Sequence, residues 1–145
     1  MSTWFDPVQR ICRGDSLPPP VARLMGFTLT SIAPGYACMA FEAGAQHANP
    51  MGTLHGGILW DSADAAMGMA SASTLGEGDT CTTLELTSNV LKPVWQATLQ
   101  AIGRVVKHGR TVGLVACDLL DANEALVARA TSTCMTLRGE QGRGR

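Results

Sequence analysis

A short polar segment in the first half of the chain collects the residue types that ligand binding and catalysis need. Residues 47–57 read His-Ala-Asn-Pro-Met-Gly-Thr-Leu-His-Gly-Gly, and two aspartates, Asp61 and Asp64, follow. The adjacent glycines Gly56 and Gly57 open a long apolar run, which predicts a helix whose first N–H groups are free and carry partial positive charge. Because glycine also lets a ligand approach the backbone closely, the segment predicts an oxyanion hole made of backbone N–H groups.

The two aspartates stand in a predicted helix that is otherwise free of charge. Acids are rarely buried unless they are paired or functional, and a spacing of three residues puts Asp61 and Asp64 on roughly one helix face. Asp64 follows Gly56 by about 12 Å along the helix axis, at 1.5 Å per residue. We expect Asp64 to act on a substrate whose carbonyl lies nearer the helix start. For Asp61, a helix-terminal charge or a subunit contact is the favoured interpretation.

His55 allows two interpretations, an acid–base group or a hydrogen-bonding residue that fixes the loop before the helix, and we favour the second. The chain has no H-E-x-x-H motif, and its five cysteines are scattered without a C-x-x-C pair, so we expect no metal and no disulfide framework. It also lacks the G-x-S-x-G, Rossmann and Walker patterns.

The elements around this segment predict an α+β domain. A short helix follows Pro18–Pro20, and the turn Pro34-Gly35 joins two strands, Thr28–Ala33 and Tyr36–Ala43. The apolar helix runs from Gly56 to about Leu75 and is expected to be buried on most sides. Four further strands are predicted at Thr80–Leu91, Thr98–Lys107, Thr111–Asp121 and Ala125–Leu137. Short connections make them antiparallel neighbours, so six strands are expected to wrap around one helix.

Length and composition set the remaining limits. The 145 residues, with 46% hydrophobic and 16% charged side chains, suit one domain whose low surface charge favours a subunit interface. Eleven bases against twelve acids disfavour a general nucleic-acid binder. We expect an N-terminal segment (1–25) with the short helix, a main domain (26–137) and a flexible Gly/Arg-rich tail (138–145). Since no membrane span or secretory signal is recognisable, the predicted location is the cytoplasm.

The spacing Asn49-x-x-Gly52-x-x-His55-Gly56-Gly57, with an acid nine residues after the histidine, resembles the active-site signature of hotdog-fold acyl-CoA thioesterases of the phenylacetate-degradation (PaaI) type. The resemblance extends from about Gly26 to Leu137. It implies a hotdog fold, in which an antiparallel sheet wraps a long helix. It also implies hydrolysis of an aryl or medium-chain acyl-CoA to the free acid and CoA, without metal or cofactor, by a homodimer or homotetramer.

The resemblance also assigns roles to single residues. Asp64 matches the family's catalytic carboxylate, which acts as nucleophile or general base. Gly56 supplies the oxyanion N–H, Asn49 orients the thioester or water, and His55 supports the loop. A threonine before Pro93 is expected to orient the water from the partner subunit; counting back ten residues gives Thr83, with Thr82 close by.

Other residues match positions that bind the substrate and its CoA moiety in the family. The positions expected to contact the substrate or its CoA phosphates are Gly57, Lys92, Lys107 and Arg110, with Arg104 and Arg138 as further candidates. The charge distribution agrees, because residues 24–91 hold six acids and no Lys or Arg, whereas residues 92–145 hold eight bases and four acids.

One departure and two alternatives stand beside this interpretation. Asp61 lies where the family usually has an apolar or small residue, and a second carboxylate facing the groove would raise one pKa. The same fold also serves hydratases and dehydratases. A non-catalytic acyl-CoA-binding protein is the second alternative.

Overall fold

The computed structural model of the protein describes residues 5–143. Three α-helices and six strands make up most of it. In chain order these are α1 (Phe5–Arg13), α2 (Pro20–Met25), β1 (Phe27–Ala33), β2 (Tyr36–Ala43), α3 (Gly56–Ala72), β3 (Thr80–Val90), β4 (Ala97–His108), β5 (Val112–Leu120) and β6 (Leu126–Leu137). Two 3-10 turns, η1 (Ala45–His47) and η2 (Gly139–Gly142), complete the list.

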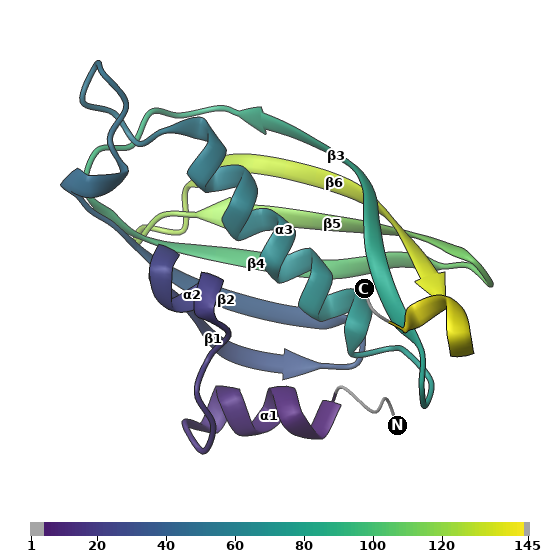
Figure 1. The fold of residues 1–145 in the computed structure, drawn as a ribbon. Coiled ribbons are helices and arrows are strands. Elements are labelled where there is room, and N and C mark those ends of the chain that lie inside the picture. The colour runs from purple at the N-terminus through teal and green to yellow at the C-terminus, as the bar shows by residue number, and fades with distance from the viewer. Residues whose placement is uncertain (1–4, 144–145) are drawn as a thin grey trace.

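The six strands form one antiparallel sheet in the order β1-β2-β4-β5-β6-β3, and the sheet curves around α3 (Figure 1). This confirms the predicted α+β hotdog arrangement. The expected hairpin is β1–β2, turning at Pro34-Gly35, where Gly35 has a φ of 73°. The helix ends at Ala72, three residues before the predicted end, and the chain then turns through Ser73 and Thr74.

One pairing prediction is wrong: β3 lies beside β6 and not beside β4. Because β3 follows α3 after a short turn, it stays beside the helix and closes the sheet on the flank opposite β1. The link to β4 starts on β6, where the Leu91 and Lys92 N–H groups donate to the Val127 carbonyl. It then passes the start of α3, where the Leu54 N–H donates to the Val94 carbonyl.

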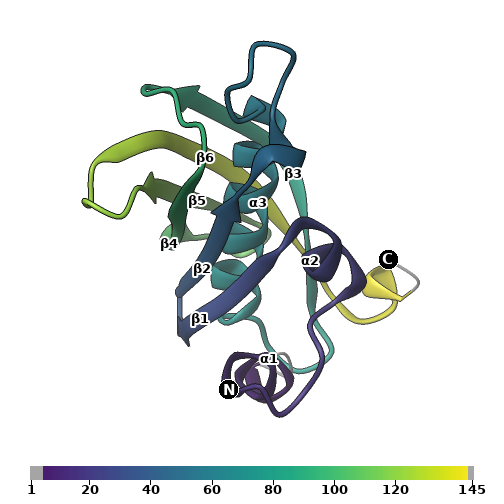
Figure 2. The same ribbon diagram turned by 90° about the vertical axis from the view of Figure 1, so that its left-hand side faces the viewer.

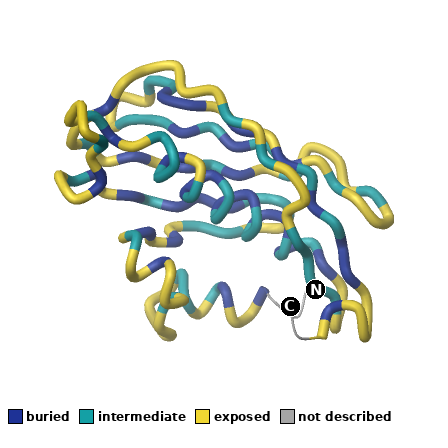
Figure 3. Tube along the Cα trace, turned by 45° about the horizontal axis from the view of Figure 1, so that its top comes forward, coloured by how far each residue is buried: buried dark blue, intermediate teal, exposed yellow. Residues whose placement is uncertain are grey.

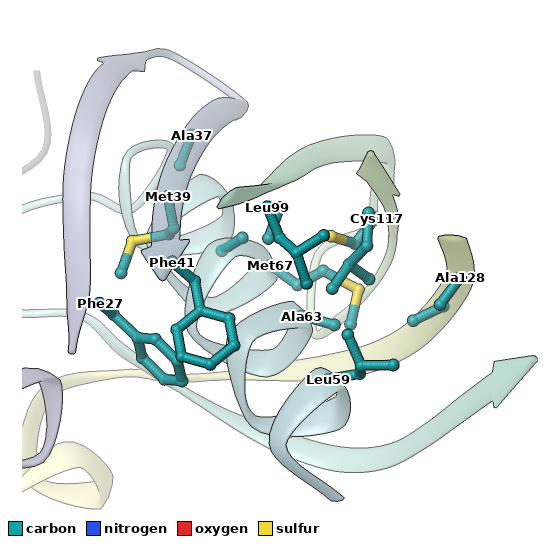
Figure 4. Close-up of a cluster of buried hydrophobic side chains, with 14 of the residues drawn as sticks. Phe27, Ala37, Met39, Phe41, Leu59, Ala63, Met67, Leu99, Cys117 and Ala128 are labelled. Atoms are coloured by element: carbon teal, nitrogen blue, oxygen red, sulfur yellow. The ribbon is translucent and has the colours of Figure 1, made fainter. Parts of the chain in front are cut away.

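The hydrophobic core lies between α3 and the concave face of the sheet. Figure 4 shows Leu59, Ala63 and Met67 of the helix gathered with side chains from the strands, and all three are almost fully buried. Small helix residues allow a close approach at Gly103 of β4, where an added Cβ would lie 2.5 Å from the Ala66 carbonyl oxygen. The backbones of α3 and β4 therefore approach each other closely here, with no layer of side chains between them.

The outer face of α3 is less buried than predicted, since Trp60 remains 50% exposed. Strand β3 is also open to solvent along much of its length (Figure 3). A bulge after Thr83 shifts the register there, and Leu84 and Val90 on the expected apolar face are 54% and 49% exposed. The simple alternation predicted for this strand therefore buries little within one chain.

The two ends of the described chain add elements that frame the sheet. The predicted short helix is α2, which begins at Pro20 and ends at the left-handed Gly26, with a φ of 80°. The helix α1 had no sequence prediction; it lies next to β1 (Figure 2). In the predicted tail, residues 139–142 form η2 and Gly142 is buried, whereas residues 144–145 lie outside the described part. Flexibility of residues 138–145 stays a prediction.

No helix within residues 5–143 has both the length and the apolar content needed to cross a membrane. All five cysteines are free thiols, and Cys38, Cys117 and Cys134 are buried. Burial, with the nearby Asp118 as a smaller cause, raises the pKa of the Cys117 thiol to about 12. This thiol therefore stays protonated and acts as a small apolar side chain in the core.

Candidate active site

The start of α3 leaves one backbone donor free. His55 is the N-cap residue; its Nδ1 accepts a hydrogen bond from the Gly57 N–H at 2.9 Å, and its carbonyl accepts one from the Ile58 N–H at 3.0 Å. Among residues 5–143, by contrast, no hydrogen bond is formed by the Gly56 N–H. An added Cβ on Gly56 would meet no heavy atom within 4 Å. The free donor at the positive end of a 17-residue helix can therefore receive an oxyanion.

The loop before the helix is shaped by Asn49. Its Oδ1 accepts hydrogen bonds from the N–H groups of Met51 (2.9 Å) and Thr53 (3.2 Å), and its Nδ2 donates to Thr53 Oγ1 at 2.8 Å. A carboxamide nitrogen has two hydrogens, so one donor of Asn49 remains for a ligand. The side chain thus holds the loop and lines the same shallow cleft as Gly56.

Asp64 is held by a residue of its own chain. Thr83 Oγ1 donates a hydrogen bond to Asp64 Oδ1 at 2.9 Å, which joins α3 to β3 across 19 positions of sequence. The family resemblance predicts a threonine from the partner subunit, whereas this contact is made within one chain. A bulge after Thr83 shifts the register of β3 against β6, and the pairing resumes at Glu85. This hydrogen bond identifies Thr83, rather than the adjacent Thr82, as the threonine in contact with the Asp64 carboxylate.

Asp61 lies one turn before Asp64, and both carboxylates line one cavity of about 340 Å³. Partial burial, and to a smaller extent the charge of Asp64, raise the pKa of the Asp61 carboxyl above 3.8. The neighbouring carboxylate thus raises the pKa of Asp61 as expected, but burial contributes more to the shift. Apart from these two acids the lining is apolar.

The candidate residues fall into two groups within one chain. Asp61, Asp64 and Thr83 gather at the apolar cavity, whereas Asn49 and Gly56 line the other cleft, next to Pro93 and Val94. Eight residues of helix, or about 12 Å, separate Gly56 from Asp64. An oxyanion donor lies about 3 Å from the oxygen that it stabilises. Within a single chain, the Gly56 N–H and the Asp64 carboxylate therefore lie too far apart to contact one carbonyl group together.

The basic residues expected at the CoA phosphates are also dispersed. Lys92 lies at the cleft with Gly56 and forms an ion pair with Asp121 at 2.5 Å. Its hydrogen bond is the main cause that lowers the pKa of the Asp121 carboxyl. Lys107 and Arg110 lie at the far end of β4, and ten residues of strand between Ala97 and Lys107 span roughly 34 Å. The further candidates, Arg104 and Arg138, contact Tyr36 and Asp79 respectively.

The prediction missed the contribution of α1. Val8 and Ile11 of this helix line the cavity that holds the two carboxylates. Their spacing carried a signal, because Phe5, Val8 and Ile11 recur every three residues, with Asp6 in the first turn and Arg13 in the last. Within the described residues no group of three or more His, Cys, Asp or Glu side chains is arranged to hold a metal ion.

Comparison with known proteins places this geometry in a family. The sequence profile of the thioesterase superfamily matches residues 51–128. The structure of a phenylacetic acid degradation-related protein from Ralstonia eutropha JMP134 is 32% identical, covers 88% of this chain and 97% of its own, and superposes with a TM-score of 0.79. A variant of the phenylacetic acid degradation protein PaaI from Thermus thermophilus is 27% identical, covers 81% and 98% of the two chains, and gives a TM-score of 0.75.

A third structure extends the likeness in fold. The PaaI protein of E. coli is 22% identical, covers 93% of this chain and 96% of its own, and gives a TM-score of 0.82. The profile match spans more than half of the chain and includes the glycine pair, Asp64 and Thr83. The chain therefore belongs to the thioesterase superfamily, as a hotdog-fold thioester hydrolase of the PaaI type.

Proposed function

We propose that the protein hydrolyses an aryl or medium-chain acyl-CoA to the free acid and CoA, with Asp64 as nucleophile or general base. The observation that carries the proposal is the Thr83–Asp64 hydrogen bond of 2.9 Å at the wall of an apolar cavity, in a family of thioester hydrolases. Such a cavity suits the acyl group, and an oriented carboxylate at its wall suits attack on the adjoining carbonyl.

Two routes serve the same residues. As a general base, Asp64 accepts a proton from water while the water oxygen bonds to the thioester carbon. As a nucleophile, its carboxylate bonds to that carbon and a mixed anhydride is then hydrolysed. In both routes the carbonyl oxygen becomes an oxyanion that accepts a hydrogen bond from the Gly56 N–H. Collapse of this tetrahedral intermediate breaks the C–S bond and releases the CoA thiolate.

A second copy of the chain completes this site. Gly56 and Asp64 lie about 12 Å apart on one helix, so the carbonyl held by Asp64 of one chain receives its oxyanion donor from Gly56 of another. The 11-residue strand β3 lies at the sheet edge beside exposed apolar side chains, which favours pairing with a second copy. We therefore expect a homodimer or a homotetramer.

Lys92 is the basic residue best situated for the CoA phosphates, because it lines the cleft next to Gly56 and Asn49. A phosphate there competes with Asp121 for the Lys92 ammonium group. Lys107 and Arg110 lie at the other end of β4, so they contact the same CoA only where a second chain brings them close.

The first experiment measures thiol release from aryl, short, medium and long acyl-CoAs, with enoyl-CoA hydration assayed in parallel. Asp64→Asn is expected to lower kcat by at least ~10², the scale for loss of a general base. Asp61→Asn, the same chemical change one turn away, is expected to cost much less. Wild-type turnover in Asp64→Asn, or hydration in place of hydrolysis, would contradict the proposal.

A second experiment tests the sharing of the site. Gly56→Pro removes the N–H at the first helical position, where proline is tolerated, and His55 already has the extended ψ of 128° that proline demands of its neighbour. Co-expression of Gly56→Pro with Asp64→Asn is expected to regain activity, because each mixed dimer keeps one intact site. Activity that does not exceed that of the separate variants would place the site within a single chain.

A further inference from the structure

A single-chain cavity of about 340 Å³ lies between the N-terminal helices and α3. Its walls come from α1, α2, β1, β2 and α3, which meet at one edge of the sheet (Figure 1). The residues from the N-terminal segment are Pro7, Val8, Ile11, Pro18, Pro19, Val21 and Ala22. Strand side chains of Phe27, Leu29 and Met39 form the floor, and α3 adds the two carboxylates, Ala65 and Met69.

The wall of the cavity formed by α1 and α2 is packed against the rest of the protein. Val8 of α1 is 5% exposed and Ala22 of α2 is 8% exposed, and both belong to the hydrophobic core. Ile11, one turn after Val8, faces the same cavity. These two helices therefore fix the width of the space on the side opposite Asp64 and Ala65.

We propose that this cavity receives the acyl group of the substrate, and that Ile11 and Ala22 set the length or width of the group accepted. The inference rests on the proposed function, since it places the acyl group beside the carboxylate that attacks its carbonyl. A volume of about 340 Å³ stands at the low end of the ~300–1,000 Å³ usual for small-molecule sites, so aryl and medium-chain groups fit better than long chains.

The two carboxylates add a second selection. An acyl group that ends in its own carboxylate would bring a third negative charge into an apolar space already lined by Asp61 and Asp64. Uncharged acyl groups avoid this repulsion. The substrate class is therefore uncharged aryl or medium-chain acyl thioesters, and dicarboxylic acyl thioesters are rejected.

The length selection is tested by kcat/KM over a straight-chain series from butyryl-CoA to dodecanoyl-CoA. Ile11→Ala widens the cavity and is expected to change the preference between longer and shorter substrates by about tenfold or more, the scale for small changes in a hydrophobic pocket. Ala22→Leu narrows the cavity and is expected to shift the preference toward shorter chains. Leu24→Ala removes the same number of carbons from the outer side of α2, where Leu24 is 81% exposed, and should leave the profile unchanged.

Identical profiles for Ile11→Ala and Leu24→Ala would overturn the assignment. That pair of variants decides the question even if Ala22→Leu, in the packed core, fails to fold. The charge selection is tested with adipoyl-CoA and hexanoyl-CoA, which have equal chain lengths. Hexanoyl-CoA is expected to react with at least ~10²-fold higher kcat/KM, since juxtaposed like charges cost several kcal/mol; equal values would refute the selection.

A binding series separates this inference from the proposed function. Ketone analogues, in which a methylene replaces the thioester sulfur, cannot be hydrolysed, and calorimetry gives their Kd values. Each added methylene that enters the cavity is expected to tighten binding by roughly fourfold, until Ile11 limits the length. Turnover without Ile11-dependent length selection refutes the cavity assignment alone, whereas Ile11-dependent binding without turnover refutes the proposed function alone.

Discussion

The proposed role of Thr83 is to hold the Asp64 carboxylate through its hydroxyl, and Thr83→Val removes that hydroxyl while keeping the size of the side chain. The lost hydrogen bond spans 2.9 Å and ends on a carboxylate. Hydrogen bonds to charged groups contribute about 1.5–3 kcal/mol. Because Thr83 is exposed, water can replace part of the donor, and we take the lower value. About 1.5 kcal/mol corresponds to a roughly tenfold loss of kcat.

The assay is thiol release under saturating and limiting acyl-CoA, so that kcat and KM are obtained separately. A positioning residue for Asp64 is expected to change kcat and leave KM nearly constant, because the cavity and the cleft proposed to bind the acyl group and CoA are untouched. Thr83→Ser keeps the donor and is expected to restore most of the activity. Thr82→Val is the matched control, since consecutive strand residues point to opposite faces of the sheet.

Three outcomes would refute the reasoning. Equal kcat values for Thr83→Val and Thr82→Val would show that the hydroxyl does not serve Asp64. A rise in KM alone would assign Thr83 to substrate binding. Failure of Thr83→Ser to restore kcat, in a protein that unfolds at the wild-type urea concentration, would show that the methyl group and not the hydroxyl matters.

Two further predictions concern stability. Gly103→Ala adds a methyl group 2.5 Å from the Ala66 carbonyl oxygen and is expected to lower the free energy of unfolding by about 1–3 kcal/mol in urea titration. The control Gly68→Ala adds the same group to open space in α3 and should instead raise it by about 0.5–1 kcal/mol; equal effects would contradict the proposed close contact. Because the raised pKa of Asp61 makes the folded chain hold a proton that the unfolded chain releases, stability falls as pH rises above 3.8. Asp61→Asn is therefore expected to raise Tm at about pH 7, with the gain disappearing near about pH 3; a gain of equal size at both pH values would refute this cause.

Local signals in the sequence account for the parts of the fold that were predicted. The glycine pair after His55 marks the start of α3, because capping and backbone freedom act within one turn. The apolar run after it requires a helix in the core, and turn residues separate the strands. The position of β3 beside β6 could not be found in this way, since short links favour neighbours and only the need to enclose α3 overrides that tendency.

The candidate site likewise has features that the sequence predicts and features that only the structure shows. Spacing in the sequence predicts Asp64 and Gly56 as site residues, but only the structure shows that the two line separate cavities. The bond from Thr83 to Asp64 links two elements through a strand bulge, which no periodicity indicates. Lys107 and Arg110 belong to the same basic part of the sequence as Lys92, yet the length of β4 separates them from Lys92 in space.

The close contact between α3 and β4 restricts which parts of the molecule can vary during evolution. At Gly103 the backbone of β4 contacts the backbone of α3. A side chain at position 103 would therefore push the helix away from the sheet and break this contact. On the other flank, α1 and α2 meet the helix across a cavity, and their side chains can change in size while α3 keeps its depth. Under the proposed assignment of the cavity, new acyl specificities can therefore arise by substitution in α1 and α2 without displacing Asp64 or Gly56.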